Sequence, residues 1–369
     1  MQDWAFLYIF GSFNHGCVKI YFYELQKLMK ILVTGAAGFI GFHLTQRLLD
    51  RGDEVVGIDS INDYYDVNLK YARLAECGIT KANASISGMR TQSDKYPQYT
   101  FIRMALEERE ALQELFTSEK FNIVVNLAAQ AGVRYSIENP HAYIDSNIVG
   151  FTNILECVRH NNVAHLVYAS SSSVYGENTK TPFSEDDRVD NPVSLYAATK
   201  RSNELMAAVY AKLYGMHITG LRFFTVYGPW GRPDMAPMLF SKAITSGEAI
   251  KVFNNGELSR DFTYIDDIIE GIVRVIDTIP QEESPAEIYN IGYGSPIQLM
   301  EFISTLEDAL DTKANIQMMP MQKGDVYTTY ADTTKLERNM GYKPVVTLQE
   351  GIAKYVEWYK SYIAKNNSN

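Results

Sequence analysis

Short apolar runs of β type alternate with longer segments of helical period through the first two thirds of the chain. The run at 121–127 is almost continuously apolar, which is typical of a parallel strand covered on both faces. This alternation predicts an α/β fold, a doubly wound parallel (Rossmann) sheet whose strand carboxyl ends form one ligand-binding edge. The predicted strands are 31–33, 54–58, 99–103, 121–127, 165–169 and 219–223, and the predicted helices include 107–116 and 143–160.

The pattern changes at two places. Residues 80–98 are polar and small without a clear period, which predicts a loop. The segment 227–233 is rich in proline and glycine, and shorter mixed elements follow it. We therefore predict a smaller C-terminal α/β domain that closes over the sheet edge. The expected division is 1–28 as a non-essential extension, 29–224 with 262–293 as the sheet domain, and 225–261 with 294–365 as the smaller domain.

Composition excludes several classes of protein. The formal net charge of -10 argues against a nucleic-acid-binding or anionic-membrane surface. The cysteines Cys17, Cys77 and Cys157 lack paired spacing, so we expect neither disulfides nor a metal site, and a reducing, cytoplasmic compartment. The apolar stretch 6–10 is too short to cross a bilayer. We expect the extension to precede a natural start at Met29, and a weak membrane-associating tail is the alternative.

Three glycines join the first predicted strand to the first predicted helix. Free N–H groups and the positive end of a helix dipole at such a turn form a receptor for a diphosphate. Asp59 ends the second strand, where a carboxylate binds ribose hydroxyls and repels a 2′-phosphate, which favours NAD over NADP. The alternative is a glycine-rich turn that only packs. The candidate cofactor contacts are Gly35, Gly38, Phe39, Ile40, Gly41 and Asp59.

A second cluster of candidates lies between 171 and 200. Tyr196 and Lys200 are four residues apart and share a helix face, where an ammonium stabilises a phenolate and lowers the tyrosine pKa. Ser171, in a run of four serines after the fifth strand, offers a hydroxyl that bridges substrate and phenolate. These three residues are the candidate catalytic group. A chance pairing on an exposed helix is the alternative.

This combination of glycine turn, serine and Tyr-x-x-x-Lys resembles the extended short-chain dehydrogenase/reductase family. Segments 126–131, 168–176, 221–224 and 260–267 are similar to its sugar-nucleotide branch, and the resemblance runs from Met29 almost to the C-terminus. It implies bound NAD, a UDP-sugar substrate and a homodimer. It also implies cofactor contacts at Ala128, Ala129, Gln130, Asn147, Tyr196, Lys200 and Phe223.

The loop 225–236 resembles that of UDP-glucuronate 4-epimerases, whereas UDP-glucose 4-epimerases usually carry asparagine in place of Thr225. Arg232 offers a planar fork that suits a carboxylate, and a surface arginine bonded to loop carbonyls is its alternative. Arg260 resembles the family's diphosphate contact, and an ion pair with Asp261 or Asp266 is its alternative. The expected substrate contacts are Arg134, Ser172, Ser173, Thr225, Arg232, Met235, Arg260 and Asp325.

Neighbouring branches are disfavoured because Ser172 and Ser173 stand where 4,6-dehydratases carry an acidic pair and UDP-glucuronate decarboxylases a glutamate. One departure from the family is Ala105, in place of the aspartate that usually holds the adenine amino group. The resemblance therefore implies UDP-glucuronate 4-epimerisation through a 4-keto intermediate with tightly bound NAD. UDP-glucose 4-epimerisation is the first alternative, and a non-catalytic NAD-binding regulator is the second.

Overall fold

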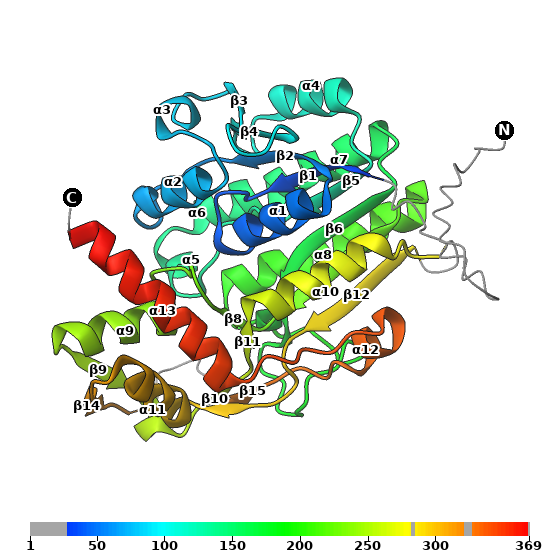
Figure 1. Cartoon of the computed structure of the whole chain (residues 1–369). Coiled ribbons are helices and arrows are strands. Elements are labelled where there is room, and N and C mark those ends of the chain that lie inside the picture. Colours follow the sequence, from blue (N-terminus) through cyan, green and yellow to red (C-terminus); the bar gives the residue numbers. More distant parts are fainter. Residues whose placement is uncertain (1–27, 282–284, 321–326, 368–369) are drawn as a thin grey trace, which may run out of the picture.

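The computed structural model describes residues 28–281, 285–320 and 327–367. Its centre is an eight-stranded sheet with the order β12-β7-β6-β5-β1-β2-β4-β3, parallel except where β3 pairs with β4 (Figure 1). The predicted doubly wound sheet is confirmed. Its strands are β1 Lys30–Thr34, β2 Glu54–Asp59, β3 Arg90–Gln92, β4 Tyr99–Arg103, β5 Ile123–Asn126, β6 His165–Ser171, β7 Ile218–Phe223 and β12 Ala286–Ile291.

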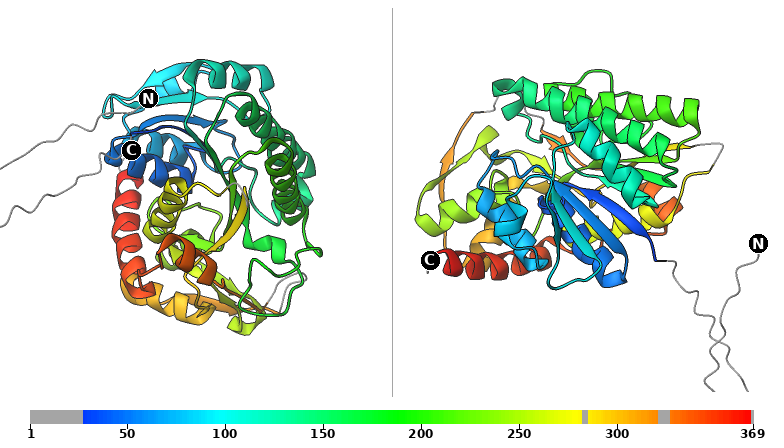
Figure 2. Two further views of the ribbon diagram at one scale, coloured as in Figure 1. Left: turned by 90° about the vertical axis from the view of Figure 1, so that its right-hand side faces the viewer. Right: turned by 90° about the horizontal axis from the view of Figure 1, so that it is seen from above.

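Helices cover both faces of this sheet (Figure 2). The strands divide their apolar residues between two cores, because successive side chains point to opposite faces. Ile31 and Val33 pack in the core with α1 Phe39–Arg51 and α10 Ile265–Asp277. Leu32 packs in the other core with α4 Arg109–Glu119, α7 Gly150–His160 and α8 Leu195–Tyr214.

Two predicted segments differ from the structure. The expected loop at 80–98 contains the short helix α3 Lys81–Ala84 and the edge strand β3. The expected helix at 143–160 is a π-helical turn, η1 Ile144–Val149, followed by α7. Elements of three or four residues are too short to establish a period, and a π turn keeps an apolar pattern close to that of an α-helix.

Three small sheets lie beyond the carboxyl ends of the large sheet, in the lower half of Figure 1. They pair β8 Thr225–Tyr227 with β11 Phe262–Tyr264, β9 Ala249–Val252 with β14 Asn315–Met318, and β10 Ser259–Arg260 with β13 Ile297–Gln298 and β15 Thr328–Thr329. The remaining elements are α2 Val67–Glu76, α5 Tyr135–Glu138, α6 Pro140–Tyr143, η2 Ser172–Tyr175, α9 Ala236–Ser246, η3 Phe253–Gly256, α11 Leu299–Leu310, α12 Thr334–Met340 and α13 Leu348–Asn367.

We propose the domain division that the sequence predicts. It is supported by β12, which joins the large sheet beside β7, and by α10, which packs against α1. The β9–β14 sheet, the β10–β13–β15 sheet and α11 stay outside the large sheet, whereas the β8–β11 pair joins the two predicted domains. The predicted extension, apart from Leu28, lies outside the described residues.

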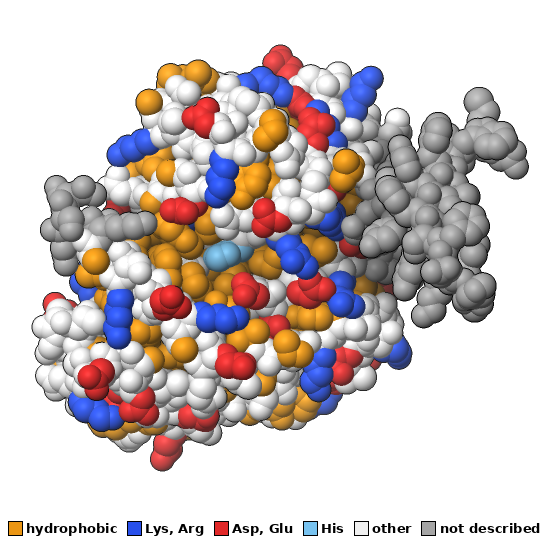
Figure 3. Space-filling view, viewed as in Figure 1, with side chains coloured by type: hydrophobic (Ala, Val, Ile, Leu, Met, Phe, Trp, Pro, Cys, Tyr) orange, Lys and Arg blue, Asp and Glu red, His pale blue; other side chains and the backbone are white. Residues whose placement is uncertain are grey.

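Acidic and basic side chains are interspersed on the face in Figure 3, without a broad basic patch among the described residues there. None of the helices in the described ranges combines the length and apolarity needed to cross a membrane. Within the same ranges, no group of His, Cys, Asp and Glu side chains is arranged to hold a metal ion.

Candidate active site

The turn between β1 and α1 is built on close backbone contacts. Gly35 has a φ of +72°, and a Cβ there would lie 2.9 Å from the Ala128 nitrogen. A Cβ on Gly41 would lie only 2.1 Å from the Gly35 carbonyl oxygen. Only glycine allows this turn and this approach of helix to strand. The helix begins at Gly38 without a side-chain cap, so its first turn can offer N–H groups to an anion.

Asp59 lies beside this turn at the carboxyl end of β2. One carboxylate oxygen accepts from the Ala37 nitrogen at 3.2 Å, and the other accepts from the Ile61 nitrogen at 2.8 Å. Two backbone donors therefore fix the carboxylate next to the glycine turn. Each oxygen still has acceptor capacity for a ribose hydroxyl. The uncapped helix start and the adjoining carboxylate fit the chemistry of a dinucleotide.

Residues after β5 form the other wall of the turn. Thr34 donates to the Asn126 side chain at 2.7 Å and accepts from the Ala128 nitrogen at 3.0 Å. Asn147 accepts from the Gln130 nitrogen at 2.8 Å and donates to Thr199 on α8 at 3.1 Å. The predicted cofactor residue Asn147 thus orients the segment that follows β5 and joins it to α8.

The three candidate catalytic residues meet at the ends of β6 and α8. Ser171 is the last residue of β6, and Tyr196 lies in the first turn of α8, where the Ser171 side chain is close enough to lower the pKa of the phenol against the larger effect of burial. Ser194 caps α8 by accepting from the Ala197 nitrogen at 3.1 Å. Lys200 donates to the Ala169 carbonyl at 2.9 Å, with its Nζ 6.0 Å from the centre of the Tyr196 ring. The structure brings all three together.

The expected effect of Lys200 on the tyrosine is wrong for this structure. Burial raises the pKa of Tyr196, and the Ser171 hydrogen bond and the charge of Arg232 only partly oppose it. Burial also lowers the pKa of Lys200 to about 8. Desolvation therefore dominates both groups. The positive charge that opposes this effect of burial on the phenol is that of Arg232, in the loop that follows β8.

Arg232 forms a pair with Asp234, close enough to Tyr196 for its charge to act on the phenol. Its Nε and Nη2 donate to the two carboxylate oxygens at 3.0 and 2.5 Å, which leaves the Nη1 edge of the guanidinium outside the pair. The Tyr64 hydroxyl donates to the same carboxylate at 3.0 Å. Although burial opposes ionisation, the hydrogen bonds and charge of Arg232 hold the pKa of Asp234 below its usual value. The Asp234 carboxylate of the chain itself therefore already occupies one edge of the Arg232 guanidinium.

The other predicted substrate residues, and Phe223, which was predicted to contact the cofactor, lie on several different elements. The Ser173 hydroxyl is buried with no hydrogen-bond partner among the described residues. The Arg134 guanidinium lies 5.9 Å from the ring centre of Phe253. Arg260 donates to the Ser259 carbonyl at 2.9 Å. Phe223 ends β7, Ser172 begins η2, Thr225 begins β8, Met235 precedes α9, and Asp325 lies outside the described residues.

Sequence reasoning missed two tyrosines of the site. Tyr143 is buried, donates to the Ala131 carbonyl at 3.0 Å and meets the Tyr196 ring edge-on at 6.1 Å between centres. Tyr64 comes from the loop after β2 and reaches Asp234, 170 residues along the chain. The only sequence signal was the tyrosine-rich stretch at 62–66, whose period predicts nothing.

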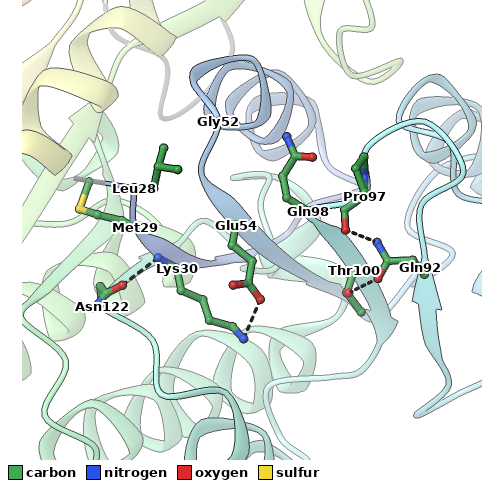
Figure 4. Close-up of a pocket in the computed structure, with 10 residues that line it drawn as sticks. All are labelled: Leu28, Met29, Lys30, Gly52, Glu54, Gln92, Pro97, Gln98, Thr100 and Asn122. Carbon is green, nitrogen blue, oxygen red and sulfur yellow. Dashed lines mark hydrogen bonds and ion pairs between the residues drawn. The ribbon is translucent and has the colours of Figure 1, made fainter. Parts of the chain in front are cut away.

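A hollow of about 680 Å³ lies at the opposite edge of the sheet, near the amino ends of β1 and β2 (Figure 4). Lys30 on its wall forms an ion pair with Glu54 at 2.7 Å (Figure 4) and a second ion pair with Glu119. Its position separates it from the site at the carboxyl ends of the strands.

Comparison with known proteins assigns the family. Residues 31–292 match the NAD dependent epimerase/dehydratase family. The chain belongs to this family. The predicted membership, the NAD cofactor and the enzyme class, an NAD-dependent sugar-nucleotide epimerase, are confirmed.

Three similar proteins illustrate where this epimerase/dehydratase lies within its family. Protein CapI of Staphylococcus aureus is 52% identical over 351 residues, which cover 91% of this chain and 100% of CapI. A probable UDP-glucuronate 4-epimerase of Rhizobium meliloti is 46% identical over 346 residues, covering 90% of this chain and 97% of that protein. A crystal structure of UDP-glucuronic acid 4-epimerase from Bacillus cereus, in complex with UDP-glucuronic acid and NAD, has a TM-score of 0.80 at 34% identity and covers 90% of this chain and 100% of that one.

Proposed function

We propose that this protein is a UDP-glucuronate 4-epimerase, which interconverts UDP-glucuronate and UDP-galacturonate. The observation that carries the proposal is Arg232, a planar carboxylate-binding group whose charge acts on the hydroxyl of Tyr196. A substrate carboxylate that contacts Arg232 would therefore place its sugar ring beside the phenol. The names of the Rhizobium and Bacillus relatives support the same substrate.

The chain's own residues supply binding, orientation and proton transfer. Bound NAD would supply the reversible hydride transfer at C4 of the sugar. Tyr196 accepts the proton of the sugar O4, directly or through the Ser171 hydroxyl, and later gives it back. Lys200 donates to the Ala169 carbonyl and would also hold the nicotinamide ribose of the bound cofactor. The first turn of α1 anchors the diphosphate, so that the cofactor stays bound between cycles.

The 4-keto intermediate of this reaction is a β-keto acid, which loses CO2 when its C5–C6 bond stands perpendicular to the carbonyl plane. We propose that Arg232, with Thr225, holds the carboxylate away from that alignment. Arg232→Ala is then expected to reduce UDP-glucuronate turnover by about 100-fold and to release a UDP-pentose. Product analysis by NMR measures both. Unchanged turnover without any pentose nucleotide would contradict this role.

The test of the whole proposal is NMR of UDP-glucuronate incubated with the purified protein without added NAD. Appearance of the galacturonate anomeric signal confirms both the activity and the retained cofactor. UDP-glucose in a parallel tube tests the first alternative, in which Arg232 is only structural. Stable NAD binding without conversion of either sugar would favour the regulator instead.

We also propose the predicted homodimer. Leu205, Val209 and Leu213 recur at a spacing of four residues on α8 and are 53%, 52% and 65% exposed. An apolar stripe of this kind on a helix is suited to pack against a second copy. The cytoplasmic location stays a prediction.

A further inference from the structure

The guanidinium of Arg73, on α2, is fully buried, and the proposed reaction gives it no role. Its hydrogen bonds go to neutral oxygens: Nη1 donates to the Ala37 carbonyl at 2.9 Å and to the Tyr65 hydroxyl at 2.7 Å. Nε and Nη2 donate to the Trp230 carbonyl at 3.1 and 2.7 Å, and Nη2 also donates to the Gly231 carbonyl at 3.3 Å. Burying a cation is unfavourable unless all its donors are satisfied, and here five hydrogen bonds satisfy the five N–H groups.

These acceptors belong to the two segments that form the active site. Ala37 lies in the dinucleotide turn, and its nitrogen donates to Asp59. Trp230 and Gly231 immediately precede Arg232 in the sequence. One side chain therefore joins the cofactor turn, 36 residues before it in the sequence, to the base of the arginine loop, 157 residues after it.

The loop needs such support because its backbone is strained. Trp230 has a φ of +60°, a left-handed conformation that a bulky residue seldom adopts without surrounding contacts. Its ring packs edge-on against Phe42 of α1 at 5.7 Å, and His43 of α1 contacts the Pro229 carbonyl at 2.9 Å. Burial lowers the pKa of His43 to about 4, so its ring is neutral near pH 7 and can donate this hydrogen bond. Arg73 completes this set of contacts by holding two successive carbonyl groups.

We propose that Arg73 is a positioning residue, which holds the loop of Arg232 in register with the dinucleotide turn and so determines selectivity for the uronate. This inference rests on the proposed function. Without the Arg73 guanidinium, Trp230 can relax from its left-handed conformation. The Arg232 side chain is then no longer oriented toward the substrate carboxylate. The Ala37 carbonyl is released at the same time, which loosens the turn that holds NAD.

The test uses Arg73→Met and Arg73→Lys, with Arg274→Met as the matched control. Arg274 also donates to two successive carbonyls, those of Met340 and Gly341, and lies over a tyrosine ring at 5.4 Å, away from the site. The measurements are the NAD content of the purified protein, the ratio of kcat/KM for UDP-glucuronate to that for UDP-glucose, and any UDP-pentose released. Arg73→Lys keeps the charge but lacks the planar fork that spans these acceptors.

We expect Arg73→Met to lower the kcat/KM ratio by at least about tenfold, since small misplacements of a binding group have effects of this size or larger. It should also lose NAD and release some UDP-pentose, while Arg274→Met keeps the wild-type ratio. Arg73→Lys should be intermediate, and it decides the question if Arg73→Met does not fold. A ratio equal to that of Arg274→Met overturns the inference. If the wild-type protein does not convert UDP-glucuronate, the proposed function fails instead, and NAD retention alone then decides the positioning role.

Discussion

Burial of Tyr196 disfavours its phenolate form, yet the proposed reaction needs this phenolate to accept a proton. Burial raises the pKa of this phenol, and the structure offers two opposing influences, the Ser171 hydrogen bond and the Arg232 charge. Bound NAD in its oxidised form adds a further positive charge, which favours the phenolate when the proton must move. We therefore expect the Ser171 hydroxyl and the Arg232 charge to influence the pH dependence of the reaction.

Removal of the Arg232 charge should change that pH dependence. Loss of a nearby cation raises a phenol pKa, so in Arg232→Met the rising limb of kcat against pH should move to higher pH. The expected shift is about one unit, which corresponds to about 1.4 kcal/mol of lost stabilisation of the phenolate. The measurement is kcat at saturating UDP-glucuronate between about pH 6 and about pH 10, which follows the rising limb up to the ordinary pKa of a phenol. Arg232→Lys keeps a cation and is the control, and an unshifted limb in Arg232→Met would show that this charge has no part in tuning Tyr196.

Strand β6, strand β7 and helix α8 are joined behind the site by a buried ion pair. Glu204 on α8 accepts from Arg222 on β7 at 2.8 and 2.9 Å, and from Ser170, the neighbour of Ser171, at 2.7 Å. Both charged groups are almost fully buried. Burial alone would raise the pKa of Glu204, but the hydrogen bonds and charge of Arg222 hold it below its usual value. This pair fixes α8, which carries Tyr196 and Lys200, against the strand that carries Ser171.

Glu204→Gln should destabilise the protein by about 3–5 kcal/mol, because it leaves the buried Arg222 without a counter-charge. Urea unfolding at pH 7 measures this loss. Since the folded-state pKa of Glu204 is lowered, the pair's contribution is present above the unfolded pKa of about 4.3 and is lost as pH falls through the folded value. The difference in free energy of unfolding between the wild type and Glu204→Gln should therefore become smaller at acid pH. Arg201→Ala is the control, because it removes a partly exposed partner of the same carboxylate and should cost no more than about 1 kcal/mol. If the free energies of unfolding of the wild type and Glu204→Gln stay parallel down to acid pH, the pair does not have the assigned role.

The six inner strands of the large sheet could be predicted from the sequence because each is a mainly apolar run that is largely buried on both faces. The edge strands β3 and β12 were not predicted, because β3 is polar and exposed and β12 is only half buried. The glycine turn and the Tyr196–Lys200 spacing were also readable, because each is a local pattern. The contact of Arg73 with Trp230 was not readable, since it joins segments 157 residues apart through backbone carbonyls that carry no residue identity. The pairing of Arg232 with Asp234, two residues away, was overlooked for a different reason: the same fork suits a substrate carboxylate and a neighbouring one equally well.

At the scale of the whole molecule, the stripe of Leu205, Val209 and Leu213 lies on α8, which packs against α7 on one face of the sheet. The same helix carries Tyr196 and Lys200 at its amino end. A dimer formed through this stripe would bury the exposed side of the helix and restrain the catalytic residues from behind. The assembly and the site would then depend on one element.

Leu205→Glu with Val209→Glu is therefore expected to convert the dimer to a monomer, because two buried carboxylates facing their symmetry mates repel one another and lose hydration. Light scattering coupled to gel filtration measures the mass, which should fall by about half on loss of a two-fold interface. Ile279→Glu is the control, because Ile279 is also exposed, at 41%, but follows α10 rather than lying on α8. We expect this control to stay dimeric. A wild-type protein that is monomeric at every concentration, or a double variant that keeps the dimer mass, would place the interface elsewhere and leave the apolar stripe on α8 without this partner.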